Sequence, residues 1–93
     1  MKDMIYKSKE GDLDLSKITR LYPAAVVDMY GEVAEMSLEW IEVNEDKVKL
    51  VHYVLVFDFT MPGEDEKNKT VLIFKTKDEL IATMAEVAQF FQD

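Results

Sequence analysis

The sequence contains no cysteine, and this absence removes several kinds of chemistry. Disulfides, thiolate zinc sites, iron–sulfur clusters and cysteine nucleophiles all need the sulfur of that residue. Histidine is nearly absent too, since His52 is the only one. A metal site would therefore have to consist mainly of carboxylates, and no acidic stretch has the full spacing of a calcium-binding loop. We expect no metal and no cofactor.

Basic residues are also scarce, and Arg20 is the only arginine. Eleven basic residues face 19 acidic ones, which gives a formal net charge of −8. Nucleic acids and anionic membranes repel such a chain at long range. There is no run of apolar residues long enough to cross a bilayer, and the first residues lack the apolar core of a signal peptide. We expect a cytoplasmic protein with neither a nucleic-acid nor a membrane partner.

Glycine and proline together account for only five positions, whereas 48% of the residues are hydrophobic. This composition is typical of a globular domain, and 93 residues suffice for one domain, 1–93. The three glycines are isolated, so no phosphate-binding loop is present. No serine lies in a G-x-S-x-G setting. We therefore expect a protein without enzymatic activity.

The segment 48–60 has the period of a long strand, with four large apolar residues on one side. These residues are Tyr53, Leu55, Phe57 and Phe59. The segment 34–43 also alternates, but its phase flips at Trp40 and Ile41. We interpret it as a bulged strand, with a helix as the alternative. The turn 44–47 then joins the two segments as a hairpin.

The segment 76–92 predicts a helix, because it has helix-forming residues and no glycine or proline. Thr76 and Glu79 have the spacing of a capping box. A broad apolar stripe, with Leu80 and Val87 at its centre, predicts that the helix packs across a sheet. The segment 70–76 is apolar on both faces and predicts a central strand.

Residues 3–8 and 24–30 predict further strands, while 14–22 fits either a strand or a short helix. Together these segments predict an α+β fold. Its curved antiparallel sheet has five to seven strands, and a C-terminal helix of about 77–92 packs on it.

Two pieces of the chain resemble pleckstrin-homology-like domains. The end, "TVLIFKTKDELIATMAEVAQFF", is similar to the last strand and helix of that family, and "LDLSKITRL" is similar to a common strand opening. The resemblance implies a seven-stranded, barrel-like sheet and a role in binding or assembly. Family members that bind phosphoinositides use a basic first hairpin, and the acidic Glu10, Asp12 and Asp14 depart from that pattern.

Two groups of residues are candidate sites. His52 needs a carboxylate to orient it as a base, and the predicted hairpin places Glu39 opposite it, as a possible polar site. Phe90 and Phe91 point about 100° apart on a helix, so burying both requires cover on two sides. With Met84 and Trp40 they form the candidate surface for a ligand or partner.

These observations favour an acidic interaction or scaffold module that associates with a protein partner or with itself, as a homodimer. The alternative is a domain that binds an apolar small molecule in a pocket between the helix and the sheet. An enzyme that uses His52 with Glu39 is a third possibility, and an acidic inhibitor of another protein is a fourth.

Overall fold

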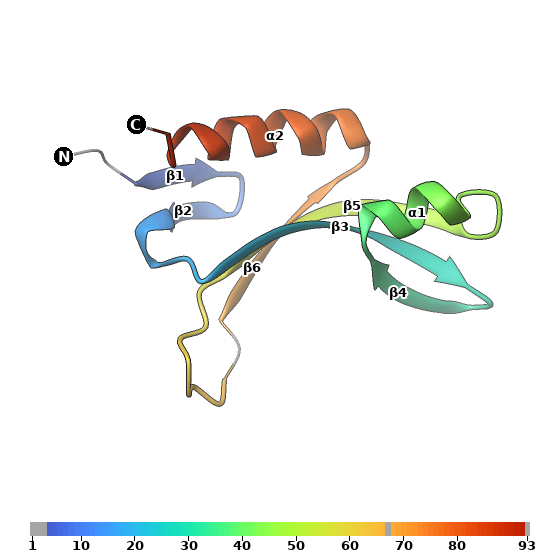
Figure 1. The fold of residues 1–93 in the computed structure, drawn as a ribbon, viewed down its shortest axis with the longest axis horizontal. Coiled ribbons are helices and arrows are strands. Elements are labelled where there is room, and N and C mark those ends of the chain that lie inside the picture. Colours follow the sequence, from blue (N-terminus) through green and yellow to red (C-terminus); the bar gives the residue numbers. More distant parts are fainter. Residues whose placement is uncertain (1–3, 67, 93) are drawn as a thin grey trace.

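The computed structural model describes residues 4–66 and 68–92 and shows an α+β fold with two antiparallel sheets and two α-helices (Figure 1). The elements in chain order are β1 (Ile5–Ser8), β2 (Gly11–Asp14), a 3-10 turn (Leu15–Lys17), β3 (Arg20–Met29), β4 (Glu32–Met36), α1 (Leu38–Asn44), β5 (Lys49–Asp58), β6 (Lys69–Phe74) and α2 (Lys77–Gln89). The larger sheet has the strand order β4-β3-β5-β6, and β1 and β2 form a separate hairpin. The six strands are thus divided between two sheets, whereas the prediction was one curved sheet.

Both helices and the β1–β2 hairpin lie on the same side of the four-stranded sheet (Figure 1). The main core lies between them, because alternate residues of β5 and β6 point towards α2. Its buried members are Leu13, Leu15, Leu55, Phe57, Leu72, Phe74, Leu80 and Val87. A second core forms under α1, where Ile41 packs on Ala25 and Val27.

The C-terminal helix was predicted correctly. The Thr76 side chain accepts a hydrogen bond from the Glu79 backbone N–H at 3.2 Å, so the predicted cap forms. Leu80 and Val87 of the apolar stripe are fully buried against the sheet. The helix ends at Gln89, because the next residues turn through shorter-range hydrogen bonds.

The predicted strand over 34–43 is wrong in its second half. Ser37 caps a new helix there, since its hydroxyl accepts from the Trp40 backbone N–H at 3.1 Å. The helical alternative holds for α1, which turns Ile41 into the core. The hairpin between 34–43 and 48–60 is therefore wrong as well. The long strand β5 pairs with β3, and their register shifts once between Val26 and Val27.

Two other strand predictions need correction. The segment 14–22 is neither a single strand nor a single helix, because it contains the end of β2, the 3-10 turn and the start of β3. The strand β6 is an edge strand, although its two apolar faces predicted a central position. No further strand pairs with the outer edge of β6 among residues 4–66 and 68–92. The Lys9 ammonium of the β1–β2 hairpin instead donates to the Ile73 carbonyl oxygen and lies 4.3 Å from the Phe74 ring centroid.

The turn between β3 and β4 holds an aromatic residue in the left-handed conformation. Tyr30 has a φ of 53° and Gly31 a φ of 84°, which is the two-residue hairpin turn that favours Asn-Gly. The Asp28 carboxylate supports this turn by accepting from the Gly31 N–H at 3.0 Å. Tyr30 itself is fully exposed. Its side chain therefore adds no packing that would offset the backbone strain.

We expect Tyr30→Asn to raise the free energy of unfolding by about 0.5–1 kcal/mol, because asparagine tolerates positive φ better than tyrosine does. Urea denaturation followed by circular dichroism measures the change. Tyr30→Phe, which keeps the strain, serves as the control and should leave the stability unaltered. A destabilised asparagine variant would show that the tyrosine ring contributes contacts of its own.

Candidate interaction surfaces

One face of the four-stranded sheet, the open face, has no helix packed on it in the part of the chain that the structure describes. The residues on this open face are given by the strand register, since side chains alternate between the two sides. They form rows across the sheet: Tyr22–Val56–Val71, Ala24–Val54–Ile73 and Glu35–Val26–His52. The buried cluster on this side consists of Ala24, Val54 and Val56, with Tyr22 and Val26 against it, and all of them belong to β3 or β5. In the described residues, no side chain of either helix belongs to this cluster.

The apolar surface of the open face is partly accessible. Val54 and Val56 are buried by their neighbours, whereas Val71 and Ile73 on the edge strand are 40% and 52% exposed. Antiparallel sheets with one solvated face usually alternate between apolar and polar residues. The strands β5 and β6 do not follow that rule, because both of their sides are apolar. Contiguous exposed apolar surface of this kind commonly marks an interaction site.

Charged residues lie at the two ends of the open face. Arg20 pairs in register with Asp58 at one end, and Asp28 pairs with Lys49 at the other. Arg20 and Lys69 both lie near the Tyr22 ring, with their cationic groups 5.0 and 5.9 Å from its centroid.

Two further charges flank these ends: Lys69 is the register partner of Asp58, and Glu35 that of Val26. The face therefore carries three basic and three acidic residues, and it is close to neutral in a chain of net charge −8.

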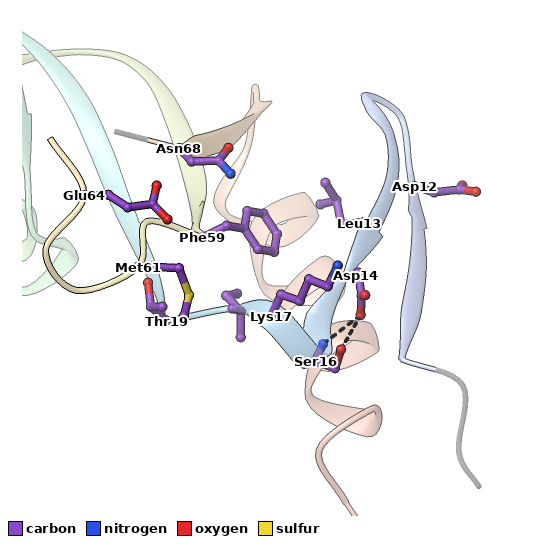
Figure 2. Close-up of a pocket in the computed structure, with 11 residues that line it drawn as sticks. Asp12, Leu13, Asp14, Ser16, Lys17, Thr19, Phe59, Met61, Glu64 and Asn68 are labelled. Atoms are coloured by element: carbon purple, nitrogen blue, oxygen red, sulfur yellow. Dashed lines mark hydrogen bonds between the residues drawn. The ribbon is translucent and has the colours of Figure 1, made fainter. Parts of the chain in front are cut away.

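A cleft of about 690 Å³ lies between the β1–β2 hairpin and the loop that follows β5 (Figure 2). Leu13, Phe59 and Met61 contribute apolar surface, while the Asp12 side chain points away from the cleft (Figure 2). The Asp14 carboxylate accepts from the Ser16 hydroxyl at 2.6 Å and from its backbone N–H at 3.1 Å. These bonds, helped by the nearby Lys17 ammonium, lower the pKa of Asp14. Internal partners thus already engage this carboxylate. No pattern in the sequence predicted the cleft.

A smaller apolar groove of about 340 Å³ runs between α2 and β3. Met84 and Phe91, two of the predicted partner-binding residues, line this groove together with Leu21. Phe90 is instead half-buried in the core, where its ring meets the Tyr6 ring edge-on at 6.0 Å. Trp40 belongs to α1 and packs against the separate core under that helix. Of the four residues predicted to bind a ligand or partner, only Met84 and Phe91 therefore lie in one groove.

The predicted pair of His52 and Glu39 is not brought together across a hairpin. His52 lies on the open face, where its register partner is Val26. Glu39 lies in the first turn of α1 and is exposed, and both helices lie on the other side of the sheet (Figure 1). The geometric premise for a histidine–carboxylate base is therefore wrong.

Tyr6 links the β1–β2 hairpin to α2, since its hydroxyl donates to the Glu86 carboxylate at 3.2 Å. Burial of the phenol, followed by this bond and by the charge of Glu86, raises the pKa of Tyr6. The folded state thus favours the protonated phenol. Its contribution to stability is complete below the ordinary tyrosine pKa and is lost as the pH rises through the raised one.

We expect the free energy of unfolding to fall more steeply in the wild type than in Tyr6→Phe between about pH 9 and pH 12. Urea denaturation at intervals across this range measures the difference. Tyr30→Phe is the matched control, because Tyr30 is fully exposed, and it should retain the wild-type dependence. Parallel curves for the wild type and Tyr6→Phe would contradict the linkage.

Comparisons of this chain with protein-family models, curated proteins and solved structures find no match. The resemblance to pleckstrin-homology-like domains therefore stays a prediction. Among the described residues, no helix is long and apolar enough to span a bilayer, and no group of three or more acidic or histidine side chains is arranged to hold a metal ion.

Proposed function

We propose that this chain is a small cytoplasmic interaction module without enzymatic activity, and that it binds a protein partner or a second copy through the open face of its sheet. The single observation behind the proposal is the pair of exposed apolar side chains on that face, Val71 and Ile73, over which no helix lies in the described part of the chain. Hydrophobic burial is the main driving force of most protein association.

The free energy of association would come from apolar side chains that folding leaves exposed. Ile73 and Val71 lie on the edge strand β6, where they pair with Val54 and Val56 of the open-face cluster. No helix residue belongs to that cluster. Fully burying an aliphatic side chain contributes roughly 1.5–3 kcal/mol. Burial of the exposed parts of these two side chains by a partner would therefore favour association.

A photoreactive residue at position 73 tests the proposal directly. Irradiation of cells that express the full chain should give discrete cross-linked products from position 73. The same residue at position 81 is the matched control, because Ile81 lies on α2 and is 51% exposed, close to the 52% of Ile73. Equal or absent cross-linking at the two positions would reject the open face as a binding surface.

The groove beside α2 supports the second candidate function, binding of an apolar small molecule. Its lining is almost entirely apolar and includes Leu55, Met84 and Phe91. A ligand that binds only the folded state raises the melting temperature. We would measure this shift across a panel of apolar compounds, with Ala88→Trp as a variant that fills the groove. No shift in the wild type, or an equal shift in the variant, would argue against this candidate.

A further inference from the structure

We infer that the partner binds as an extended acidic segment of another protein, which adds a fifth, antiparallel strand to the outer edge of β6. This inference rests on the proposed function, because the added strand would lie beside Val71 and Ile73, the exposed residues of the open face. Its evidence is the direction of the backbone groups of β6, together with the basic side chains along the same edge.

Two backbone hydrogen bonds at the end of β5 show which groups of β6 point outward. The Phe59 N–H donates to the Asn68 carbonyl oxygen at 2.7 Å, so these two residues form a hydrogen-bonded pair that extends the β5–β6 ladder. The Thr19 N–H donates to the Asp58 carbonyl oxygen at 2.7 Å, so the Asp58 carbonyl points towards the β3 side. Hydrogen-bonded and non-hydrogen-bonded pairs alternate along an antiparallel ladder. The pair of Asp58 with Lys69 is therefore non-hydrogen-bonded.

Three alternate residues of β6 consequently direct their N–H and C=O groups away from β5: Lys69, Val71 and Ile73. The bond from the Lys9 ammonium to the Ile73 carbonyl oxygen agrees with this direction. In the described part of the chain, no other protein group bonds to the outward N–H and C=O of Val71 and Ile73. Unpaired backbone groups of this kind are a template for a further strand.

The side chains at the same positions favour an apolar neighbour. Val71 and Ile73 pair with Val56 and Val54 of the open-face cluster, and they remain 40% and 52% exposed. Directly opposite residues of an antiparallel pair have their side chains on the same side of the sheet. Apolar residues opposite Val71 and Ile73 would therefore bond to their backbone groups and also cover their side chains. Peptides that add a strand to a sheet edge bind in this combined way.

The outer edge of β6 is basic, although the chain has a net charge of −8. Residues 68–77 include three lysines and no acidic residue. Lys69 begins β6 and Lys75 follows it, while the Lys9 ammonium lies 4.3 Å from the Phe74 ring centroid. The Ile73 carbonyl oxygen has a second lone pair, so its bond with Lys9 leaves it open to an added strand. Acidic side chains at the ends of the partner segment would complement these charges.

The same lysines oppose the other strands that this edge could accept. Antiparallel pairing of β6 with a second β6, centred on Leu72, would place Lys69 opposite Lys75 at both ends. It would also bring two Lys9 ammonium groups into one interface. Like charges directly opposite each other destabilise a strand pair, and lysine on an edge strand is a common protection against edge-to-edge pairing. The edge therefore excludes a copy of itself and basic segments, and it admits an acidic one.

The probe that tests this inference is the peptide Glu-Glu-Val-Thr-Val-Thr-Glu-amide with fluorescein at its N-terminus. In the antiparallel register its two valines lie opposite Ile73 and Val71, and its terminal glutamates lie opposite Lys75 and Lys69. Its second glutamate lies opposite Phe74, on the side where Lys9 lies. Fluorescence anisotropy with the full chain, up to millimolar concentration, should show saturable binding. A peptide with lysine in place of each glutamate should bind at least tenfold more weakly.

Two N-methylated forms of the probe separate strand addition from simple attraction between charges. Methylation of both valine N–H groups removes the donors that face β6. Methylation of both threonine N–H groups changes only donors that face away from β6, and it gives a peptide of the same mass and charge. The valine form should bind at least tenfold more weakly than the unmodified probe, and the threonine form should stay within about threefold of it.

Variants of the protein test the same contacts from the other side. Val71→Pro removes the outward N–H but no bond of the ladder with β5, and proline is tolerated at such edge positions. It should weaken binding of the probe at least tenfold. Lys75→Glu should raise the dissociation constant at least threefold, whereas Lys47→Glu, the same charge change in the turn before β5, should alter it less than twofold. Circular dichroism establishes that each variant is folded.

The outcomes separate this inference from the proposed function. Equal binding of the two N-methylated probes, or no binding of the unmodified probe at millimolar concentration, overturns the added strand. Cross-links from position 73 to a different protein would still support the proposed function in either case. The comparison of the N-methylated probes uses the wild-type chain, so it decides the question even if Val71→Pro fails to fold.

Discussion

Phe57→Ala is expected to lower the free energy of unfolding by about 3–5 kcal/mol, the largest effect of any single substitution considered for this chain. The Phe57 side chain is completely buried on the helix side of β5. Its ring stacks on the Tyr6 ring with centroids 6.3 Å apart, and thereby joins the sheet to the β1–β2 hairpin. Alanine at this position would leave a cavity between three packed elements, and tight packing limits how far they can close it.

Urea denaturation gives this loss of stability, and Phe91→Ala provides a matched control. Phe91 belongs to the same residue type, but it lies after α2 and is 51% exposed. We expect Phe91→Ala to lower the free energy of unfolding by less than about 1 kcal/mol, because little packing is removed. If the two variants were equally stable, the core would have to lie elsewhere than between the sheet and α2.

The β1–β2 hairpin is attached to the rest of the molecule mainly through side chains, and this explains the large expected effect of Phe57→Ala. The hairpin forms its own two-stranded sheet and is not part of the strand ladder of the larger one. Side chains hold it in place, with Leu13 and Leu15 inserted into the main core and Tyr6 between Phe57 and Phe90. A cavity at Phe57 therefore weakens the attachment of the hairpin as well as the packing of α2.

The sequence predicted the structure correctly where the signal lies within one segment, as with a helix cap or the spacing of apolar residues. The helix α2 was predictable because Thr76 and Glu79 supply a cap and the apolar stripe has helical period. The helix-facing side of β5 was predictable too, because the large residues Tyr53, Leu55 and Phe57 recur at every second position and therefore share one side of a strand. In both cases the signal lies within one segment.

Strand pairing was the part that the sequence did not determine. The short turn at 44–47 suggested a hairpin, but the pairing of β5 with β3 depends on contacts between residues about 30 positions apart. The segment 34–43 failed for a related reason: its alternation and its helical spacing were both present, and the cap at Ser37 together with the burial of Ile41 decided between them. Tertiary packing overrides local preference in such short segments.

The error over β6 bears most directly on function. Apolar residues on both of its sides were interpreted as the mark of a central strand, and yet β6 lies at the edge. The inward residues Leu72 and Phe74 are explained by the main core, but the outward residues Val71 and Ile73 are not. A pattern that predicts burial on two sides is consistent with a second layer, which a partner bound to the open face would supply.

Self-association through the open face is one form of the proposed function. For that dimer, Ile73→Asp is expected to raise the dissociation constant by more than 100-fold, which corresponds to about 2.7 kcal/mol or more. Association through the open face would bury the new carboxylate, because Ile73 is 52% exposed on the open side of β6. Desolvation of an unpaired charge opposes association strongly. Sedimentation equilibrium measures the change.

Ile81→Asp is the matched control, since it makes the same substitution at an equally exposed isoleucine on α2 and gives the chain the same net charge. Its dissociation constant should stay within about threefold of the wild type, and Val71→Asp should reproduce the large effect of Ile73→Asp from a second position on β6. Because both open-face side chains are substantially exposed in the monomer, the variants should remain folded by circular dichroism while they lose the dimer. If Ile81→Asp dissociated the dimer and the two β6 variants did not, the interface would lie on the helix side of the molecule. The exposure of Val71 and Ile73 would then need another explanation.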